Sequence, residues 1–200
     1  MSEVGAAADA PLAGRRLLIA ITGAVAAIGV PRFLLSLRTE GATVRVVSTP
    51  HGDQFLPIGS MSVFSGGPSR RTMRSLTTPG TAMPGQGHDA ADVVVVLPAT
   101  ANILGKAALG LADDAVSAAI AMSARPVVFV PAMNDAMWTN GRVERNARTL
   151  RNAGHVIVEP GPGMEVADLR PTLGALASFT RIRQAILDAL RLPSPAQVSQ

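Results

Sequence analysis

Two short apolar runs, each bounded by proline, place the strongest constraint on how this chain can fold. They are Val93–Leu97 and Pro126–Val130, and a polar segment follows each of them at once. An unbroken apolar run of this length is typical of a strand buried on both faces of a parallel sheet. Ligands bind at the carboxyl edge of such sheets. The polar segments 98–102 and 131–138 are therefore the first candidates for a binding site.

The rest of the chain alternates between strand-like and helix-like segments. The expected strands are 17–21, 43–47, 93–97, 126–130 and 155–158. The expected helices run from a turn at 22–24 to about 39, and over about 55–64, 101–109, 114–123, 141–153 and 174–191. Strands that alternate with helices in this way predict an α/β fold with a doubly wound parallel sheet.

One domain accounts for most of the chain. Residues 1–14 are rich in Ala and Gly and are expected to be a disordered tail; 15–192 form a single α/β domain, and 193–200 a loose tail. Two segments, 65–90 and 159–173, are expected to be long loops. Loops of that length in a compact domain are usually functional or disordered.

Composition excludes several classes of function. The 200 residues include no cysteine, which rules out disulfides, thiolate metal sites and a cysteine nucleophile. The net charge is +4, but most of the arginines are scattered and aromatics make up only 3%, so no nucleic-acid partner is expected. No apolar run is long enough to span a bilayer, and the N-terminus does not resemble a signal peptide. A cytoplasmic protein without a membrane partner or a metal is expected.

The turn after the first strand has the features of a phosphate site. Thr22-Gly23-Ala24 offers a hydroxyl and a glycine at the start of a helix, and the second strand ends in the hydroxyls of Ser48 and Thr49. The GxGxxG fingerprint is absent, and no acid ends the second strand, so a mononucleotide fits better than a dinucleotide. A simple structural turn is the alternative.

The two polar segments also allow a purely structural interpretation. Asn102 and Asn134 each precede or begin a predicted helix, where asparagine is a common N-cap. Trp138, the only tryptophan, would then belong to the core. This alternative stays open at the level of the sequence.

Pro98-Ala99-Thr100-Ala101-Asn102 and Pro131-Ala132-Met133-Asn134-Asp135-Ala136-Met137-Trp138 resemble two motifs of the flavin-dependent cysteine decarboxylases. These motifs are Pro-Ala-Ser-Ala-Asn-Thr and Pro-x-Met-Asn-x-x-Met-Trp, and the family includes phosphopantothenoylcysteine decarboxylase and lantibiotic-type peptidyl-cysteine decarboxylases. The second motif is matched in full. The first departs at Thr100, where serine is usual, and at Ile103, where threonine is usual. The resemblance covers roughly residues 15–160.

The resemblance implies a flavodoxin-like or Rossmann-like three-layer flavoprotein with FMN as its cofactor. It places the FMN contacts at Thr22, Gly23, Ala24, Ser48, Thr49, Thr100, Ala101, Asn102, Asp113, Ser117 and Met133. The amides of Asn102 and Asn134 would fix the substrate carboxylate as catalytic groups, and Asn134, Met137 and Trp138 would bind substrate. Asp113 and Asp114, which match a further family stretch, are also expected to cap the helix that follows. The family further implies trimers or larger trimer-based assemblies.

The catalytic histidine of the family has no direct counterpart here. Its position, eight residues before Asp92, is occupied by Pro84, and the nearest histidine is His88. A histidine suits the thiol proton near neutral pH, so His88 is the leading candidate and His51 the weaker one. His155 begins a strand and is expected to be structural.

The missing cysteine separates the branches of the family. Phosphopantothenoylcysteine decarboxylases carry a cysteine after the last strand, which helps to return electrons to their intermediate. The corresponding segment, 160–168, has none, and the peptidyl branch needs none. The resemblance therefore implies oxidative decarboxylation of the C-terminal cysteine of a ribosomally made precursor peptide. This gives an enethiol for aminovinyl-cysteine formation, with the loops 65–90 and 159–173 as peptide clamps.

Three alternatives to this function remain open at the level of the sequence. They are phosphopantothenoylcysteine decarboxylase of coenzyme A biosynthesis, a non-catalytic flavin-binding regulatory protein and a flavin prenyltransferase. The match to the second motif, Pro131–Trp138, argues against the last of these.

Overall fold

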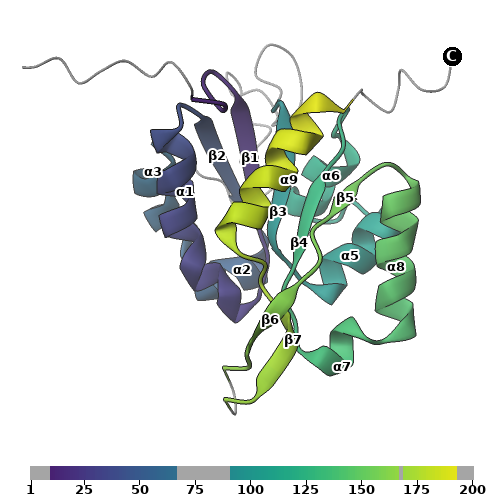
Figure 1. The fold of residues 1–200 in the computed structure, drawn as a ribbon. Helices are drawn as coiled ribbons and strands as arrows, with labels where there is room; N and C mark the ends of the chain where they lie inside the picture. Colours follow the sequence, from purple (N-terminus) through teal and green to yellow (C-terminus); the bar gives the residue numbers. More distant parts are fainter. Residues whose placement is uncertain (1–9, 67–90, 167–168, 193–200) are drawn as a thin grey trace, which may run out of the picture.

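A central parallel sheet organises the fold of the computed structural model, which describes residues 10–66, 91–166 and 169–192. Its five strands lie in the order β2-β1-β3-β4-β5, and all four pairings are parallel (Figure 1). The strands are β1 (Arg16–Ile21), β2 (Thr43–Ser48), β3 (Val93–Ala99), β4 (Val128–Pro131) and β5 (Val156–Ile157). The predicted doubly wound α/β fold is confirmed, and every expected strand is present.

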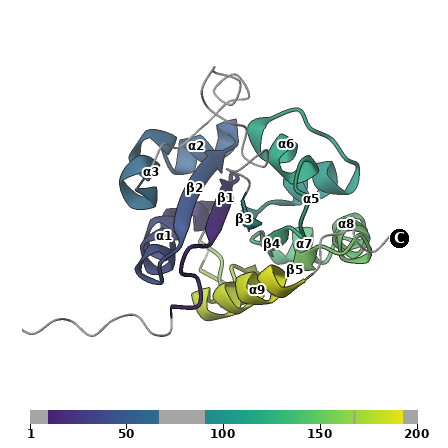
Figure 2. The ribbon, with the colours of Figure 1, turned by 90° about the horizontal axis from the view of Figure 1, so that it is seen from above.

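Helices cover both faces of this sheet, as the view from above shows (Figure 2). One face packs against α1 (Val30–Thr39), α3 (Ile58–Ser65) and α9 (Phe179–Arg191). The other packs against α5 (Ala101–Ala108), α6 (Ala115–Ala121) and α8 (Gly141–Asn152). Alternate residues of the strands enter the two cores: Leu17 and Ile19 join the first, Leu18 and Ala20 the second. This division explains why the strands are apolar throughout their length.

Two of the expected helical segments differ in the structure. The turn after β1 leads into a short 3-10 helix, η1 (Val25–Gly29), before α1 begins, and Pro31 lies in the first turn of α1. The helix expected at 55–64 is α3, which begins at Ile58, and α2 (Pro50–Phe55), which was not expected, precedes it. Pro57 separates them because proline lacks an N–H and forces the preceding residue, Leu56, into extended backbone.

The expected loop at 159–173 is instead largely a β-hairpin. Its strands β6 (Gly161–Met164) and β7 (Pro171–Ala175) pair antiparallel and form a sheet of their own. A Cβ on Gly163 would lie 2.5 Å from the Cβ of Ala175, so the close approach of the two strands requires glycine there. Glycine and proline in this segment allow the pairing rather than prevent it. Consequently α9 begins at Phe179, later than expected.

The domain also begins earlier than expected. Residues 10–14, assigned to the disordered tail by composition, form a turn in which Leu12 is fully buried in the first core. The remaining tail residues, 1–9 and 193–200, and most of the predicted loop 65–90 lie outside the described residues. Within the described part of the chain, no helix is both long and apolar enough to cross a membrane.

Candidate functional site

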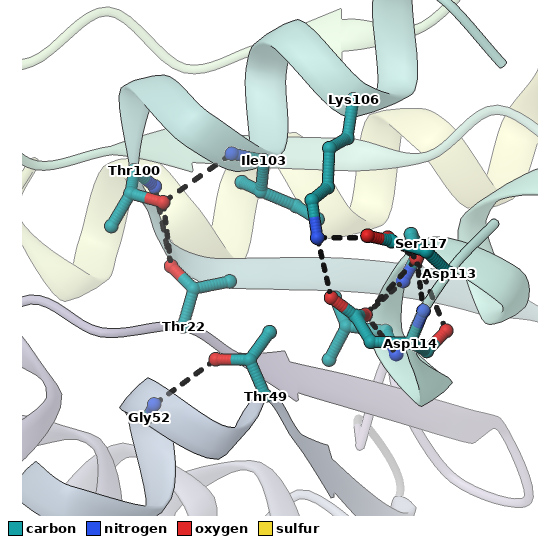
Figure 3. Close-up of polar contacts among 10 residues, drawn as sticks. Thr22, Thr49, Gly52, Thr100, Ile103, Lys106, Asp113, Asp114 and Ser117 are labelled. Atoms are coloured by element: carbon teal, nitrogen blue, oxygen red, sulfur yellow. Dashed lines mark hydrogen bonds and ion pairs between the residues drawn. The ribbon is translucent and has the colours of Figure 1, made fainter. Parts of the chain in front are cut away.

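A buried hydroxyl joins the ends of two neighbouring strands at the carboxyl edge of the sheet. Thr22 Oγ1 donates a 2.7 Å hydrogen bond to the carbonyl of Pro98 and accepts one of 3.2 Å from the backbone N–H of Thr100. The first turn and the segment after β3 are thereby held together (Figure 3). Because its proton is already donated to Pro98, Thr22 supports the site rather than offering a free donor.

The two hydroxyls that end β2 have different surroundings. Ser48 is fully buried, and its hydroxyl donates hydrogen bonds to backbone carbonyls, including that of Thr49 at 3.1 Å. Its role is therefore to stabilise the backbone where β2 ends. Thr49 is the N-cap of α2, where its Oγ1 accepts a 3.0 Å hydrogen bond from the N–H of Gly52 (Figure 3). Thr49, but not Ser48, is among the residues that line a cavity at this edge of the sheet.

We call that cavity, of about 640 Å³, the polar cavity. Its volume is in the range of small-molecule sites. It gathers side chains from the first turn, the start of α2, the helix α5 and the turn before α6. The residues used below are Thr22, Gly23, Thr49, His51, Thr100, Asn102, Lys106, Asp113, Asp114 and Met137.

Lys106 lies between two carboxylates in the wall of the polar cavity. Its Nζ is 2.8 Å from Asp113 Oδ1 and 3.0 Å from Asp114 Oδ2 (Figure 3). The hydrogen bond to Asp113 is the main reason why the pKa of Lys106 is raised, and the same bond lowers the pKa of Asp113. The cation therefore compensates acidic charge that would otherwise face any anion in the cavity.

The predicted cap of α6 is formed by Asp114. This aspartate accepts hydrogen bonds from the N–H groups of Val116 and Ser117, while Ser117 Oγ accepts from the N–H of Asp114, a reciprocal capping box. Asp113 is exposed and binds Lys106 instead. Ser117 is buried behind the two aspartates and bonded to them, so it orients them rather than lining the cavity.

An adjoining hollow of about 370 Å³, the apolar cavity, lies between the segment after β4 and the hairpin. Gly23, Thr100 and Met137 line both cavities. The apolar cavity is also lined by Ala24, Ala101, Met133 and Asn134 from the sheet edge, and by Met164, Glu165 and Val166 from the hairpin. The predicted site residues of the first turn and of both motif segments therefore meet at one edge.

The capping interpretation is confirmed for one asparagine and wrong for the other. Asn134 is the N-cap of the short helix α7 (Asp135–Trp138), where its Oδ1 accepts a 2.9 Å bond from the N–H of Met137. This bond uses only the side-chain oxygen, and Asn134 is among the residues that line the apolar cavity. Thr100 is the N-cap of α5, so Asn102 lies in the first turn of that helix and lines the polar cavity. The two carboxamides therefore lie on adjoining cavities.

Trp138 and the histidines differ in where they lie. Trp138 lines neither cavity: it packs against the second core and borders a separate surface hollow with Arg151. His88 lies outside the described residues, whereas His51 lines the polar cavity. His155 is structural, as expected: its Nδ1 accepts from the N–H of Val127 at 3.2 Å and its ring meets Phe129 edge-on.

Sequence analysis missed the contribution of Lys106, and it expected segment 159–173 near the site as a loop rather than as a hairpin. The lone lysine of an arginine-rich chain was a signal for the first. The length of segment 159–173 was the signal for its place near the site, whereas no local pattern signals its antiparallel pairing.

The strand order and the cavities at the carboxyl edge define a flavodoxin-like α/β domain with a nucleotide-sized site. The chain belongs to the Flavoprotein family, whose model matches residues 6–191. Mersacidin decarboxylase of Bacillus sp. (strain HIL-Y85/54728) is 32% identical over 155 residues, which is 74% of this chain and 75% of that protein.

Two further similarities come from a bifunctional protein and a crystal structure. The coenzyme A biosynthesis bifunctional protein CoaBC of Mycolicibacterium smegmatis is 32% identical over 178 residues, 88% of this chain but only 42% of CoaBC. The crystal structure of the FMN-dependent cysteine decarboxylase SpaF has a TM-score of 0.75 at 35% identity, covering 90% of this chain and 97% of SpaF. The resemblance to flavin-dependent cysteine decarboxylases is thereby confirmed at the level of the family.

Proposed function

We propose that this protein is an FMN-dependent decarboxylase that oxidises the C-terminal cysteine of a peptide. The observation that carries the proposal is the position of Asn134, which lines an apolar cavity that adjoins a polar one and whose cap bond uses only its Oδ1. A carboxamide NH₂ offers hydrogen-bond donors and no charge, so Asn134 can hold a substrate carboxylate. The similarity to mersacidin decarboxylase and SpaF supports the same function.

The residues of the polar cavity fit a flavin mononucleotide. Thr49, Thr100 and Asn102 supply hydroxyl and amide groups, and Gly23 leaves backbone accessible at the turn. Lys106 offsets the charge of Asp113 and Asp114, which would otherwise repel a phosphate. We assign the polar cavity to FMN, held by these residues, and the apolar cavity to the end of the substrate.

The proposed reaction removes CO₂ and two hydrogens from the cysteine residue. FMN supplies, when bound, the two-electron oxidation that side chains cannot perform. The chain itself binds and orients the substrate: Asn102 and Asn134 donate hydrogen bonds to its carboxylate. We assign the thiol proton to His88, with His51 as the alternative because it lines the polar cavity. His88→Asn and His51→Asn should separate the two, since loss of a general base slows turnover by about 10²- to 10⁴-fold.

The hairpin β6–β7 is the proposed peptide clamp. Several of its residues are apolar and well exposed, among them Met164 at 57%, Leu169 at 71% and Leu173 at 66%. The same hairpin lines the apolar cavity, so a peptide whose end enters that cavity would run along it. Deletion of residues 160–170 should therefore raise the peptide KM, and unchanged kinetics would contradict the clamp.

Phosphopantothenoylcysteine decarboxylase is the second candidate, favoured by the similarity to CoaBC. The absence of cysteine from the whole sequence argues against it, because that branch uses a cysteine to complete its reductive step. Trimers or trimer-based assemblies are also proposed, and light scattering on the purified protein tests them.

Mass spectrometry of both substrate classes tests the function. Synthetic peptides ending in Cys, and phosphopantothenoylcysteine, are incubated separately with purified FMN-loaded protein. A loss of about 46 Da from a peptide corresponds to CO₂ plus two hydrogens and supports the proposal. A loss of about 44 Da from phosphopantothenoylcysteine would assign the second candidate instead. FMN binding without either product would point to a regulatory role.

A further inference from the structure

Asp135 connects the segment that carries Asn134 to the hairpin. Its Oδ1 accepts three hydrogen bonds, from Thr172 Oγ1 at 2.7 Å, the N–H of Leu173 at 2.5 Å and the N–H of Gly174 at 3.1 Å. All three donors belong to β7, whereas Asp135 is the first residue of α7. A single carboxylate therefore joins two elements that are far apart in the sequence but lie side by side (Figure 1).

The backbone of β7 lies directly on the same segment. The N–H of Met133 donates a 3.0 Å hydrogen bond to the carbonyl of Gly174, and a Cβ on Gly174 would lie only 2.0 Å from the Met133 carbonyl oxygen. No side chain can be accommodated at position 174 in this arrangement. The contact between β7 and residues 133–135 is therefore close and specific.

This contact fixes the position of the hairpin, which forms one wall of the apolar cavity. The strands β6 and β7 pair with each other and not with the strands of the central sheet, and several of their side chains are exposed. Asp135 is not among the residues that line the cavity, but its neighbour Asn134 and the hairpin residues Met164 and Thr172 are. Asp135 can therefore influence the cavity only through what it holds.

We propose that Asp135 is a positioning residue that anchors the hairpin over the apolar cavity, so that the peptide-binding wall and Asn134 form one unit. The anchoring itself follows from the contacts above; its consequence for substrate binding rests on the proposed function. The carboxylate matters, because hydrogen bonds to a charged acceptor are stronger than those to a neutral one. The bonds from Thr172 and from the two amides also keep the pKa of Asp135 below its usual value.

The first test needs no activity. Hydrogen–deuterium exchange compares wild type with Asp135→Ala, Asp135→Asn and the control Asp188→Ala, an exposed acid on α9. The amides of Leu173 and Gly174 should exchange about ten-fold faster in Asp135→Ala, since opening of the anchored strand becomes easier. In Asp135→Asn, which keeps an oxygen acceptor, the exchange rates of these amides should lie between those of wild type and Asp135→Ala. Exchange in β1 and β3 should stay unchanged. Equal exchange at Leu173 and Gly174 in all four proteins would overturn the anchoring.

The second test separates positioning from chemistry. With a Cys-ending peptide, Asp135→Ala and Thr172→Val should raise KM about ten-fold, the effect typical of a lost charge-assisted hydrogen bond, and leave kcat within about two-fold of wild type. Thr172→Ser, which keeps the hydroxyl, should restore KM. The double variant should be no worse than Asp135→Ala alone, because both changes remove the same bond. A fall in kcat at constant KM would overturn the role in positioning.

The two proposals fail in different ways. If wild type processes no peptide, the proposed function fails while hydrogen exchange still decides whether Asp135 anchors the hairpin. If wild type is active but the exchange rates are equal, the anchoring fails and the proposed function stands.

Discussion

Gly23 and His51 lie so close together that no side chain fits between them. A Cβ on Gly23 would be 2.6 Å from the Cβ of His51 and 3.2 Å from its carbonyl carbon. The turn after β1 and the start of α2 thus meet at the polar cavity, which both residues line. Glycine is needed here for a close approach of two backbones, not for a left-handed conformation.

Gly23→Ala should therefore narrow the polar cavity and destabilise the fold. Overpacking of this kind costs about 1–3 kcal/mol, and FMN bound per protein, measured by absorbance, should fall. Gly59→Ala is a matched control, because Gly59 lies in α3 with nothing within 4 Å of an added Cβ. It should leave FMN content unchanged. Full FMN content in Gly23→Ala would contradict the assignment of the cavity.

Asn134→Asp should separate capping from substrate binding. An aspartate can still accept the hydrogen bond from the N–H of Met137, so the cap of α7 and the melting temperature should be preserved. The amide donor is replaced by a negative charge, which repels a substrate carboxylate. We expect kcat/KM for a Cys-ending peptide to fall roughly 10- to 100-fold.

Asn140→Asp provides the control. Asn140 caps α8 in the same way, because its Oδ1 accepts a hydrogen bond from the N–H of Arg142. Its kinetics should match those of wild type. If Asn134→Asp behaved in the same way, Asn134 would be only a helix cap.

Lys106→Met should weaken the binding of FMN. Without the cation, Asp113 and Asp114 leave two uncompensated carboxylates at the polar cavity, and the side chain of Asp114 is only 15% exposed. We expect the FMN Kd, measured by fluorescence quenching, to rise about ten-fold. In Lys106→Arg, which keeps a cation, the Kd should rise less.

Arg148→Met is the control for this prediction, because Arg148 pairs with Glu144 on the exposed face of α8. Such surface pairs contribute little, so its FMN Kd should equal that of wild type. An unchanged Kd in Lys106→Met would place the cofactor elsewhere.

His155 should make the stability of the fold depend on pH. Burial lowers its pKa from the usual 6.5, and its Nδ1 must stay unprotonated to accept from Val127. The unfolded chain therefore binds a proton more readily, and the stability contributed by neutral His155 is complete above pH 6.5 and is lost as pH falls below it. One such group changes the free energy of unfolding by at most about 1.4 kcal/mol per pH unit.

Urea unfolding between pH 5 and pH 7.5 measures this contribution. In His155→Gln, whose side-chain oxygen can accept from the same N–H, the decline toward low pH should be smaller than in wild type. An identical decline in both proteins would assign the pH dependence to other groups.

The sheet and the edge at which the cavities lie were predictable because they depend on local patterns. The apolar runs at Val93–Leu97 and Pro126–Val130 are strands, and the segments that follow them meet at one edge because parallel strands end together. Their two asparagines do line adjoining cavities. What each hydroxyl does there was not predictable: the partner of Thr22 is the carbonyl of Pro98, 76 positions away.

The sequence by itself therefore determined the α/β class, the order of its elements and the edge at which polar side chains gather. Hydrophobic periodicity and helix signals act over a few residues and are visible in one dimension. Only the tertiary structure decided that 161–175 contains a hairpin, that Asp135 binds it, and that Ser48 faces inward. Each of these depends on the close approach of backbones or on a bond between distant residues, which packing creates and local propensity cannot encode.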